Sequence, residues 1–363
     1  MAEIKRKPYF MVPSDYKIET AETLAYLNKK YEMKVEELYG NVPINSIGSG
    51  RRPSDLPQIT LDDFREYVNR LENYGMKFHY TLNTTCMGNG EFTKAGQQEL
   101  IDFVGEIYDC GVRIFTVAIP PVVDILGKVF PDIEVTVSTI YGADSVMKIK
   151  ELEGKDNVRQ ICLKEDVNRD FNKLKKLAKC TNLELTTIIN SCCILDCPMR
   201  NMHYNFESHA AQVHVPEYYL SWCMLEKIKN PEIMLRMPFI RPEDLHYYIE
   251  AGIVGFKIGG REHKNADIAR SVEAYMMQHY DGNLYDLLLN FSRGYVNRLF
   301  YIDNRQLDGR LEKMIKKTEP CIRTECDECG ICKPYFDKLS VDTKLVSGFN
   351  RLFNKNIKDC MGD

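Results

Sequence analysis

The alternation of short apolar runs with amphipathic stretches over the first 280 residues constrains the fold most strongly. Eight of the apolar runs are rich in Val, Ile, Phe, Tyr and Thr and are too short for helices, which is typical of buried strands. The predicted strands are residues 9–12, 35–39, 77–82, 114–119, 134–138, 160–163, 183–189 and 254–258. A further run, 233–239, is a candidate for an additional strand.

Helical patterns separate these runs, at residues 19–31, 61–74, 94–110, 144–152, 170–178, 216–228, 242–251 and 265–280. Strands that alternate with helices indicate a parallel sheet, because each parallel pair needs a crossover. Eight such units predict an α/β fold of the (β/α)8 barrel type, a TIM-like barrel, with an open doubly wound sheet as the alternative. We place the barrel domain at 1–300 and a C-terminal cysteine-rich extension at 301–363.

The charge balance and the apolar runs limit the classes of partner. Lys and Arg number 48 against 52 Asp and Glu, so no global basic surplus favours nucleic acid. The run at 311–317 is interpreted as a solvated helix face, and a small-molecule or peptide-linked substrate is preferred to RNA. The chain shows no membrane-length apolar segment and no signal peptide, so we expect a cytoplasmic protein without a membrane partner.

The thirteen cysteines are therefore expected to be reduced, and their clustering points to metal ligation. The strongest motif is Cys321-x4-Cys326-x2-Cys329-x2-Cys332. A Cys-x2-Cys-x2-Cys run is typical of [4Fe–4S] ligation, whereas structural zinc more often uses two separated Cys-x-x-Cys pairs. A zinc site, redox thiols and a purely structural metal that fixes a small tail are the alternatives.

A second cysteine-rich stretch begins where the predicted strand 183–189 ends, on the expected functional face of a barrel. Cys193-x3-Cys197 suits two ligands of one cluster, and Cys223 is a candidate third. The candidates for the fourth are Cys86, just past the strand 77–82, and Cys192. The alternative is that these cysteines are small buried hydrophobic residues.

The same stretch departs from one known cluster motif and adds candidate proton carriers. Arg200 stands where the C-x3-C-x2-C motif of radical S-adenosylmethionine enzymes has its third cysteine, which argues against that chemistry. Two histidines, His203 and His209, are candidates for proton transfer or iron ligation.

Two glycine-rich stretches carry basic residues. The sequence GFKIGGREHK at 255–264 combines a strand, a Gly-Gly turn, Lys257 and Arg261, which suits a carboxylate or phosphate. A simple strand-to-helix turn is the alternative. The stretch 46–53, with Arg51 and Arg52, is a candidate lid or anion contact. The chain has no H-E-x-x-H, G-x-S-x-G or G-x-G-x-x-G motif, so metalloproteases, α/β-hydrolases and Rossmann dehydrogenases each lose their usual signature.

Two of these segments resemble peptidase family U32, the collagenase-like proteins. The block RPEDLHYYIEAGIVGFKIGGRE at 241–262 is similar to the family pattern "PxDL…GvdxxKIxGR", and residues 12–41 are similar to its opening strand, helix and "VYxG" strand. The resemblance covers roughly residues 9–280. The spacing of the cysteine block departs from the commonest family spacing, and many members lack the tail motif.

The resemblance implies a [4Fe–4S] cluster in a barrel-like domain and, as in several members, oxygen-independent hydroxylation with prephenate as the suspected oxygen donor. It implies Cys193, Cys197 and Cys223, with Cys86, as cluster ligands. Arg200, Lys257 and Arg261 would bind a carboxylate, and His203 or His209 would move protons.

Three functions compete at this stage: an iron–sulfur-dependent hydroxylase or related atom-transfer enzyme, a peptidase, and a non-catalytic electron-transfer or scaffold protein. In the last, the tail cluster would dock a partner protein.

Overall fold

The computed structural model describes residues 6–43, 47–53, 56–210, 216–261, 263–289, 294–317, 319–321 and 326–362. Its centre is a closed parallel barrel in which the strands follow one another in sequence order and β1 pairs with both β2 and β8. The strands are β1 Tyr9–Pro13, β2 Lys34–Gly40, β3 Lys77–Leu82, β4 Ile114–Val117, β5 Glu134–Val137, β6 Val158–Cys162, β7 Glu184–Ile188 and β8 Gly255–Lys257. The predicted TIM-like barrel is confirmed, and the β1–β8 pairing excludes the open sheet.

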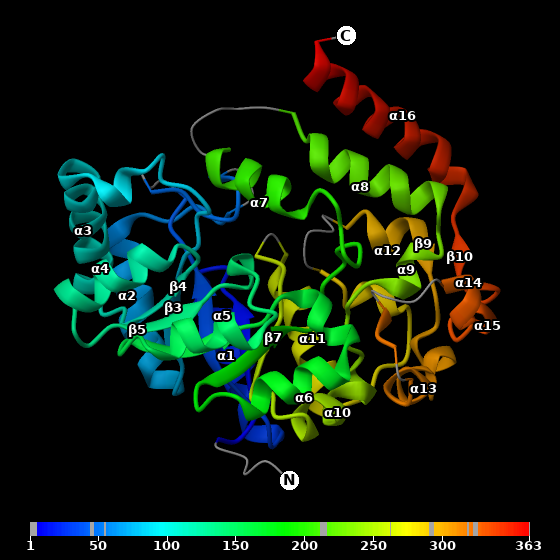
Figure 1. Cartoon of the computed structure of the whole chain (residues 1–363), viewed down its shortest axis with the longest axis horizontal. Helices are drawn as coiled ribbons and strands as arrows, with labels where there is room; N and C mark the ends of the chain where they lie inside the picture. The colour runs from blue at the N-terminus through cyan, green and yellow to red at the C-terminus, as the bar shows by residue number, and fades with distance from the viewer. Residues whose placement is uncertain are drawn as a thin grey trace.

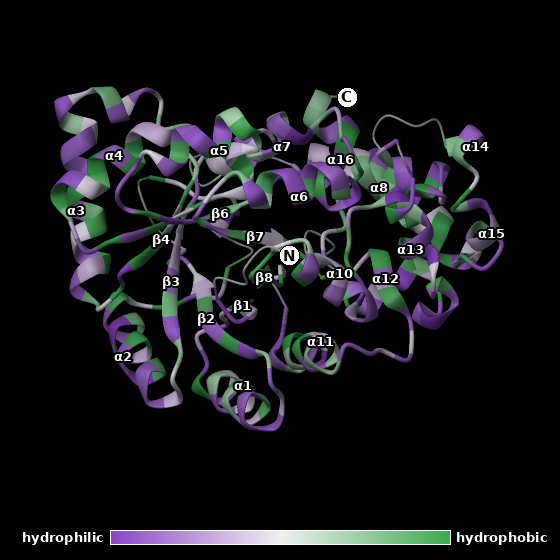
Figure 2. Cartoon of the chain, turned by 60° about the horizontal axis from the view of Figure 1, so that its bottom comes forward, coloured by the Kyte–Doolittle hydropathy of each residue, from purple (hydrophilic) through white to green (hydrophobic). Residues whose placement is uncertain are grey.

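Helices surround the barrel because each carries one apolar face. In α1 the buried residues Ala21, Leu24 and Leu27 recur at helical spacing, and Figure 2 shows hydrophilic and hydrophobic residues alternating along α1, α2 and α11 around the strands. The crossover helices are α1 Ile18–Lys30, α2 Leu61–Leu71, α3 Lys94–Asp109, α4 Pro120–Val129, α5 Val146–Glu153 and α6 Phe171–Lys179, and α11 Asn265–Met277 follows β8.

The connection from β7 to β8 is much longer than the other crossovers. It contains α7 Arg200–His209, α8 Tyr218–Lys229, α9 Ile233–Arg236 and α10 Leu245–Glu250. The candidate strand at 233–239 was wrong, because its first four residues form the helix α9. Its apolar residues are buried in a second core instead of a sheet, and a short apolar run does not by itself distinguish the two.

This second core lies beside the barrel and is built from residues 192–239 and 284–353. Its C-terminal elements are α12 Val296–Leu299, β9 Phe300–Tyr301, α13 Arg310–Ile315, α14 Cys326–Cys329, α15 Lys333–Phe336, β10 Ser340–Val341 and α16 Thr343–Met361. The helix α16 runs along α8, as Figure 1 shows, and buries Phe349 and Phe353. Residues on both sides of position 300 share this core, and the domain boundary predicted there stays a prediction.

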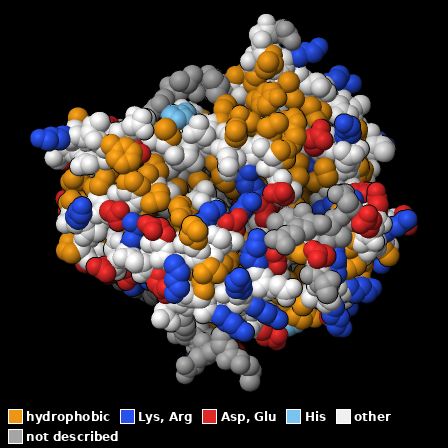
Figure 3. Space-filling view, viewed as in Figure 1, with side chains coloured by type: hydrophobic (Ala, Val, Ile, Leu, Met, Phe, Trp, Pro, Cys, Tyr) orange, Lys and Arg blue, Asp and Glu red, His pale blue; other side chains and the backbone are white. Residues whose placement is uncertain are grey.

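The surface of this second unit carries an apolar area. Figure 3 shows hydrophobic side chains gathered on the face where α8 and α16 lie in Figure 1, and Leu352 and Met361 of α16 are exposed. None of the helices in the described ranges combines the length and the hydropathy needed to cross a bilayer.

Candidate active site

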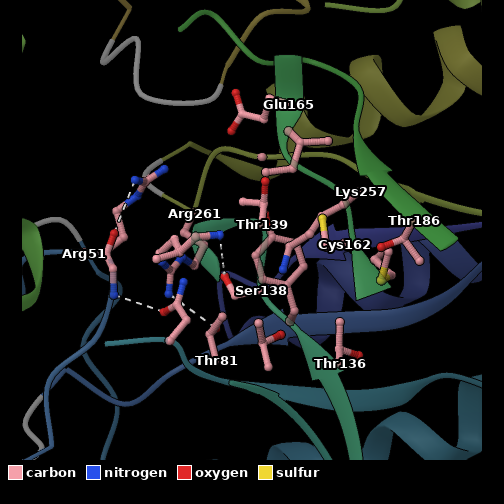
Figure 4. Close-up of a pocket in the computed structure, with 18 of the residues that line it drawn as sticks. Arg51, Thr81, Thr136, Ser138, Thr139, Cys162, Glu165, Thr186, Lys257 and Arg261 are labelled. Atoms are coloured by element: carbon pink, nitrogen blue, oxygen red, sulfur yellow. Dashed lines mark hydrogen bonds between the residues drawn. The ribbon is translucent and has the colours of Figure 1, made fainter. Parts of the chain in front are cut away.

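A cavity of about 60 Å³ opens at the carboxyl ends of the barrel strands, where a TIM barrel carries its chemistry. We call it the mouth cavity. It is lined by polar side chains from successive strands and loops, including Arg51, Thr81, Thr116, Thr136, Ser138, Thr139, Cys162, Glu165, Thr186, Tyr204, Lys257 and Arg261. In Figure 4, Arg51 and Arg261 lie on the left of the cavity and Lys257 and Cys162 on the right.

Three cationic side chains line this cavity against one carboxylate. Arg261 is buried, and its guanidinium donates hydrogen bonds to Asn41 and, at 3.4 Å, to Thr81 Oγ1. Glu165, the carboxylate, accepts a hydrogen bond from Ser191. The excess of positive charge in a largely buried cavity favours an anionic ligand. The structure brings Lys257 and Arg261 together as their spacing predicted, and it adds Arg51 to them.

Lys257 has an unusual environment for a lysine. Its Nζ lies 3.9 Å from the centroid of the Tyr39 ring. Burial lowers the pKa of Lys257 to about 8, the nearby Cys162 opposes this shift, and the charges of Arg261 and Arg51 add to it. At neutral pH a fraction of this amine is therefore unprotonated.

The neighbouring arginine of the 46–53 stretch has a different role. Arg52 contacts Glu217 at 3.5 Å and Glu207 of α7 at 3.6 Å, and its guanidinium lies 4.8 Å from the centroid of the Phe206 ring. Arg52 thus ties the loop to α7 while Arg51 faces the mouth cavity. Residue 46 of this stretch lies outside the described residues.

A buried polar line runs under the mouth cavity, and the sequence analysis missed it. His79 Nδ1 lies 2.7 Å from Glu37 Oε2, and its Nε2 lies 2.7 Å from the hydroxyl of Thr116, which lines the cavity. Burial raises the pKa of Glu37, but His79 and Arg159 outweigh that effect and lower it to about 2. The available signal was the presence of Glu37, His79 and Thr116 inside otherwise apolar strands.

A second cavity, of about 30 Å³, lies between α7, α8 and the loop after β7. We call it the β7 thiol pocket. It is lined by Cys192, Cys193, Cys197 and Cys223, together with Met199, Arg200, His203, Tyr204, Tyr219, Trp222 and Lys227. The three cysteines of the loop and Cys223 of α8 thus line one pocket, and their role as cluster ligands stays a prediction.

Two of the predicted residues, Cys86 and His209, do not line the β7 thiol pocket. Cys86 is not in the lining of the β7 thiol pocket; its sulfur accepts a hydrogen bond from the amide of Gly88 at 3.3 Å. Cys192, the alternative fourth cysteine, lines the pocket. His209 ends α7 and lines none of the three cavities described here, whereas His203 stacks on Tyr219 at a centroid distance of 5.5 Å.

The half-buried Cys193, Cys197 and Cys223 and the buried Cys192 share the β7 pocket with two buried cations, Arg200 and Lys227. Burial and the nearby Glu165 raise the pKa of Cys193 well above its usual range, and Arg200 opposes the shift. Burial also raises the pKa of Cys197. Lys227 donates a hydrogen bond to the carbonyl of Cys192 at 2.6 Å.

Arg200, predicted to bind a carboxylate, is a lining residue of this pocket. Its Nη2 donates to Asp166 at 3.1 Å and to the carbonyl of Ile194 at 2.6 Å. Its Nε and Nη1 are buried and have no hydrogen-bond partner among the described residues. Buried donors of this kind normally find an acceptor, so these two nitrogens are positioned to bind an anionic group in the pocket.

The third cavity, of about 290 Å³, contains all four cysteines of the tail motif. We call it the tail thiol pocket; its lining includes Cys321, Cys326, Cys329 and Cys332, with Ile194, Leu195, Asp196, Leu235, Arg236, Lys317 and Phe336. Lys317 donates to Cys329 Sγ at 2.9 Å, and Arg310 lies 3.6 Å from Cys332 Sγ. Burial alone raises the pKa of Cys329, but Lys317 outweighs it and lowers that pKa. Residues 322–325 lie outside the described residues.

Each of the three cavities shares a lining residue with the next. Tyr204 lines both the mouth cavity and the β7 thiol pocket, and Ile194 lines both thiol pockets. Within the described ranges, no three Cys, His, Asp or Glu side chains converge closely enough to hold a single metal ion. Four cysteines line each thiol pocket, and four thiolates are a donor set that both [4Fe–4S] clusters and structural zinc use.

Comparisons with known proteins give the family. The family model described as "Peptidase family U32" matches residues 24–284, which is more than half of the chain. The "Uncharacterized protease MJ1657" of Methanocaldococcus jannaschii is 32% identical over 319 residues, which cover 87% of this chain and 92% of that protein.

A solved structure supports the fold. "The Structure of the U32 Peptidase Mk0906" aligns with a TM-score of 0.51 at 16% identity over 71% of this chain and 93% of the other. The match of the family model and the archaeal relative confirm the resemblance seen in the sequence. The chain belongs to peptidase family U32.

Proposed function

We propose that this chain is an iron–sulfur-dependent enzyme that modifies a carboxylate-bearing substrate, small or carrier-linked, in the mouth cavity. The proposal rests on one observation: the mouth cavity lies next to the β7 thiol pocket. A cavity lined by Arg51, Lys257 and Arg261 shares Tyr204 with a pocket that contains four cysteines. An anion-binding site beside a thiol-lined site is what substrate and cofactor need if they are to meet.

Cys193, Cys197 and Cys223 would hold three irons of the catalytic [4Fe–4S] cluster, and Cys192, not Cys86, is the fourth cysteine that lines the same pocket. When bound, a cluster with an iron that the thiolates leave open supplies the chemistry for oxygen-independent hydroxylation or a related atom transfer. Arg200 and Lys227 would balance the negative charge of the thiolates, since both lie in the pocket lining. The unpartnered Nε and Nη1 of Arg200 support this role.

The remaining residues would position the substrate and move protons. Arg51 and Arg261 would hold its carboxylate. Tyr204 would separate the substrate from the thiol pocket, because it lines both cavities. His203, whose Nε2 lies 3.4 Å from Glu207 Oε1, would exchange protons at the β7 thiol pocket, which it lines. The tail thiol pocket would hold a second metal centre, [4Fe–4S] or zinc, which fixes the tail or passes electrons from a partner protein.

A peptidase is the second candidate, because both relatives carry protease or peptidase in their names. A cysteine nucleophile is activated by a lowered pKa, and burial raises the pKa of both Cys193 and Cys197. The thiols of the β7 pocket therefore suit ligation better than nucleophilic attack.

The test is anaerobic purification followed by iron, sulfide and zinc analysis and an absorption spectrum. We expect iron and sulfide in the full chain. Cys193→Ala should lose the iron bound in the β7 thiol pocket, and Cys326→Ala should lose the metal bound in the tail thiol pocket. Cys110→Ala is the matched control, because Cys110 is buried among core residues and lies outside both pockets. A colourless protein that cleaves peptides without iron, or that contains zinc alone, would overturn the proposal.

A further inference from the structure

Lys257 is a lysine of the mouth cavity that forms no ion pair with the described carboxylates. It ends β8 and pairs with Met11 of β1 and Ile188 of β7, so its side chain rises from the barrel into the mouth cavity. No carboxylate of the described residues lies within ion-pair distance of its Nζ. The Nζ instead lies over the face of the Tyr39 ring. Lys164, at the rim, has instead a carboxylate oxygen of Asp166 at 3.0 Å.

An amine in such a place is suited to attack a carbonyl carbon. The attacking form is the neutral amine, and burial together with adjacent cations is a known way to make it available. The groups whose charges act on Lys257 are the cations Arg51 and Arg261, the thiol of Cys162 and the buried Glu37 and His79, and Glu165 lines the same cavity. With a pKa of about 8, roughly a tenth of the Lys257 side chains are neutral at pH 7.

The cations also specify what the carbonyl compound must carry. Arg51 and Arg261 line the same small cavity as Lys257, and a guanidinium binds a carboxylate through parallel hydrogen bonds. A cavity of about 60 Å³ accommodates a compact head group. A 2-oxo acid meets both requirements, because its carboxylate is attached directly to the carbonyl carbon that the amine would attack.

We propose that Lys257 forms a covalent imine with a 2-oxo acid whose carboxylate is bound by Arg51 and Arg261. The amine nitrogen attacks the ketone carbon, a C–N bond forms, and the carbonyl oxygen takes a proton to give a carbinolamine. That oxygen then leaves as water, both of whose hydrogens come from the amine, and a C=N bond remains. The step needs no oxidant and no reductant. It names a substrate class for the mouth cavity and so rests on the proposed use of that cavity.

The test traps the imine in the purified full chain. The protein is incubated with pyruvate and sodium cyanoborohydride, which reduces an imine to a stable carboxyethyl group on the lysine, and the modified peptide is identified by mass spectrometry. We expect the label on Lys257, at least ten times more than on Lys164. Labelling spread evenly over the surface lysines would overturn the proposal.

Variants and a second ketone sharpen the result. Lys257→Met and Lys257→Arg should lose the label at this site, whereas Lys164→Met should retain it. Arg261→Lys should lower the labelling about tenfold, and acetone, which has no carboxylate, should label Lys257 at least tenfold less than pyruvate. Equal labelling by acetone would overturn the assignment of the carboxylate site. Each variant is compared with the parent by circular dichroism and thermal unfolding, and mapping of the label in the parent chain does not depend on any variant.

The result is separable from that for the cluster. Trapping needs no iron, so a labelled Lys257 in protein without iron would uphold the imine and refute the iron–sulfur enzyme. An iron-loaded protein that is not labelled at Lys257 would do the reverse.

Discussion

The two thiol pockets contain the same type of donor in contrasting surroundings. In the β7 pocket the cavity is about 30 Å³, the cations Arg200 and Lys227 are buried, and burial raises the pKa of Cys193. In the tail pocket the cavity is about 290 Å³, and Lys317 donates directly to Cys329. For the proposed function, a small pocket that shares Tyr204 with the mouth cavity suits catalysis, whereas a larger pocket with a lysine-paired thiol suits assembly, structural support or exchange with a partner.

The largest expected effect concerns the second core, which borders the β7 thiol pocket through Cys192 and the tail thiol pocket through Leu235. Phe353 is 1% exposed and packs on Tyr295 and Phe349. We expect Phe353→Ala to lower the free energy of unfolding by about 3–4 kcal/mol, as measured by denaturant titration. The control is Leu352→Ala on the same helix, which is 41% exposed and should cost about 0.5 kcal/mol or less. Equal effects of the two variants would show that α16 does not stabilise this core.

The second effect compares the two pockets directly. In metal-free protein that retains its circular dichroism spectrum, Cys329 should be alkylated by iodoacetamide about 100-fold faster than Cys193 at pH 7. Lys317 lowers the pKa of Cys329, whereas burial raises that of Cys193. Peptide mass spectrometry over time gives both rates. Similar alkylation rates of Cys329 and Cys193 would show that the thiols of the two pockets do not differ in reactivity.

The third effect tests the cause of that reactivity. Lys317→Met should slow the alkylation of Cys329 about tenfold at pH 7 and move the midpoint of its rate–pH profile to higher pH, because the shift that lowers the pKa is lost. Lys313→Met is the matched control, since Lys313 contacts the Tyr335 ring and not a thiol. A midpoint that does not move would assign the reactivity to exposure alone.

The smallest effect concerns the polar line under the barrel mouth. The pKa of Glu37 falls from 4.5 to about 2 on folding, so its contribution to stability is complete above pH 4.5 and is lost as the pH falls toward 2. The loss is on the order of 3 kcal/mol at most and grows only over that acid range. Glu37→Gln should flatten this part of the profile of unfolding free energy against pH. An unchanged acid slope would contradict the role of Glu37.

Much of the barrel was predictable because short runs of apolar and β-branched residues, separated by amphipathic stretches, mark the positions of buried parallel strands. The eight runs became β1 to β8, and Lys257 and Arg261 reached the mouth because both follow from a strand end. The tail cysteines share a cavity because their spacing is short. In contrast, the role of 233–239 depends on a second core that no local pattern describes.

The missed residues of the site depend on contacts between distant segments. Tyr204, Glu165 and Tyr39 come from three separate segments, and only the closed barrel places them around one cavity. Cys86 was expected beside Cys193 because both follow strands, but strands β3 and β7 lie far apart around the ring. The polar tail also contained a signal that was overlooked: Phe349 and Phe353 lie one helical turn apart and anchor α16.

Electron paramagnetic resonance of the reduced protein tests the central claim most directly. We expect one component of the iron–sulfur signal to persist in Cys326→Ala, to disappear in Cys193→Ala, and to change shape when a 2-oxo acid fills the mouth cavity next to Tyr204. A signal that vanishes entirely with the tail cysteines would contradict it, because no iron would then lie beside the barrel mouth.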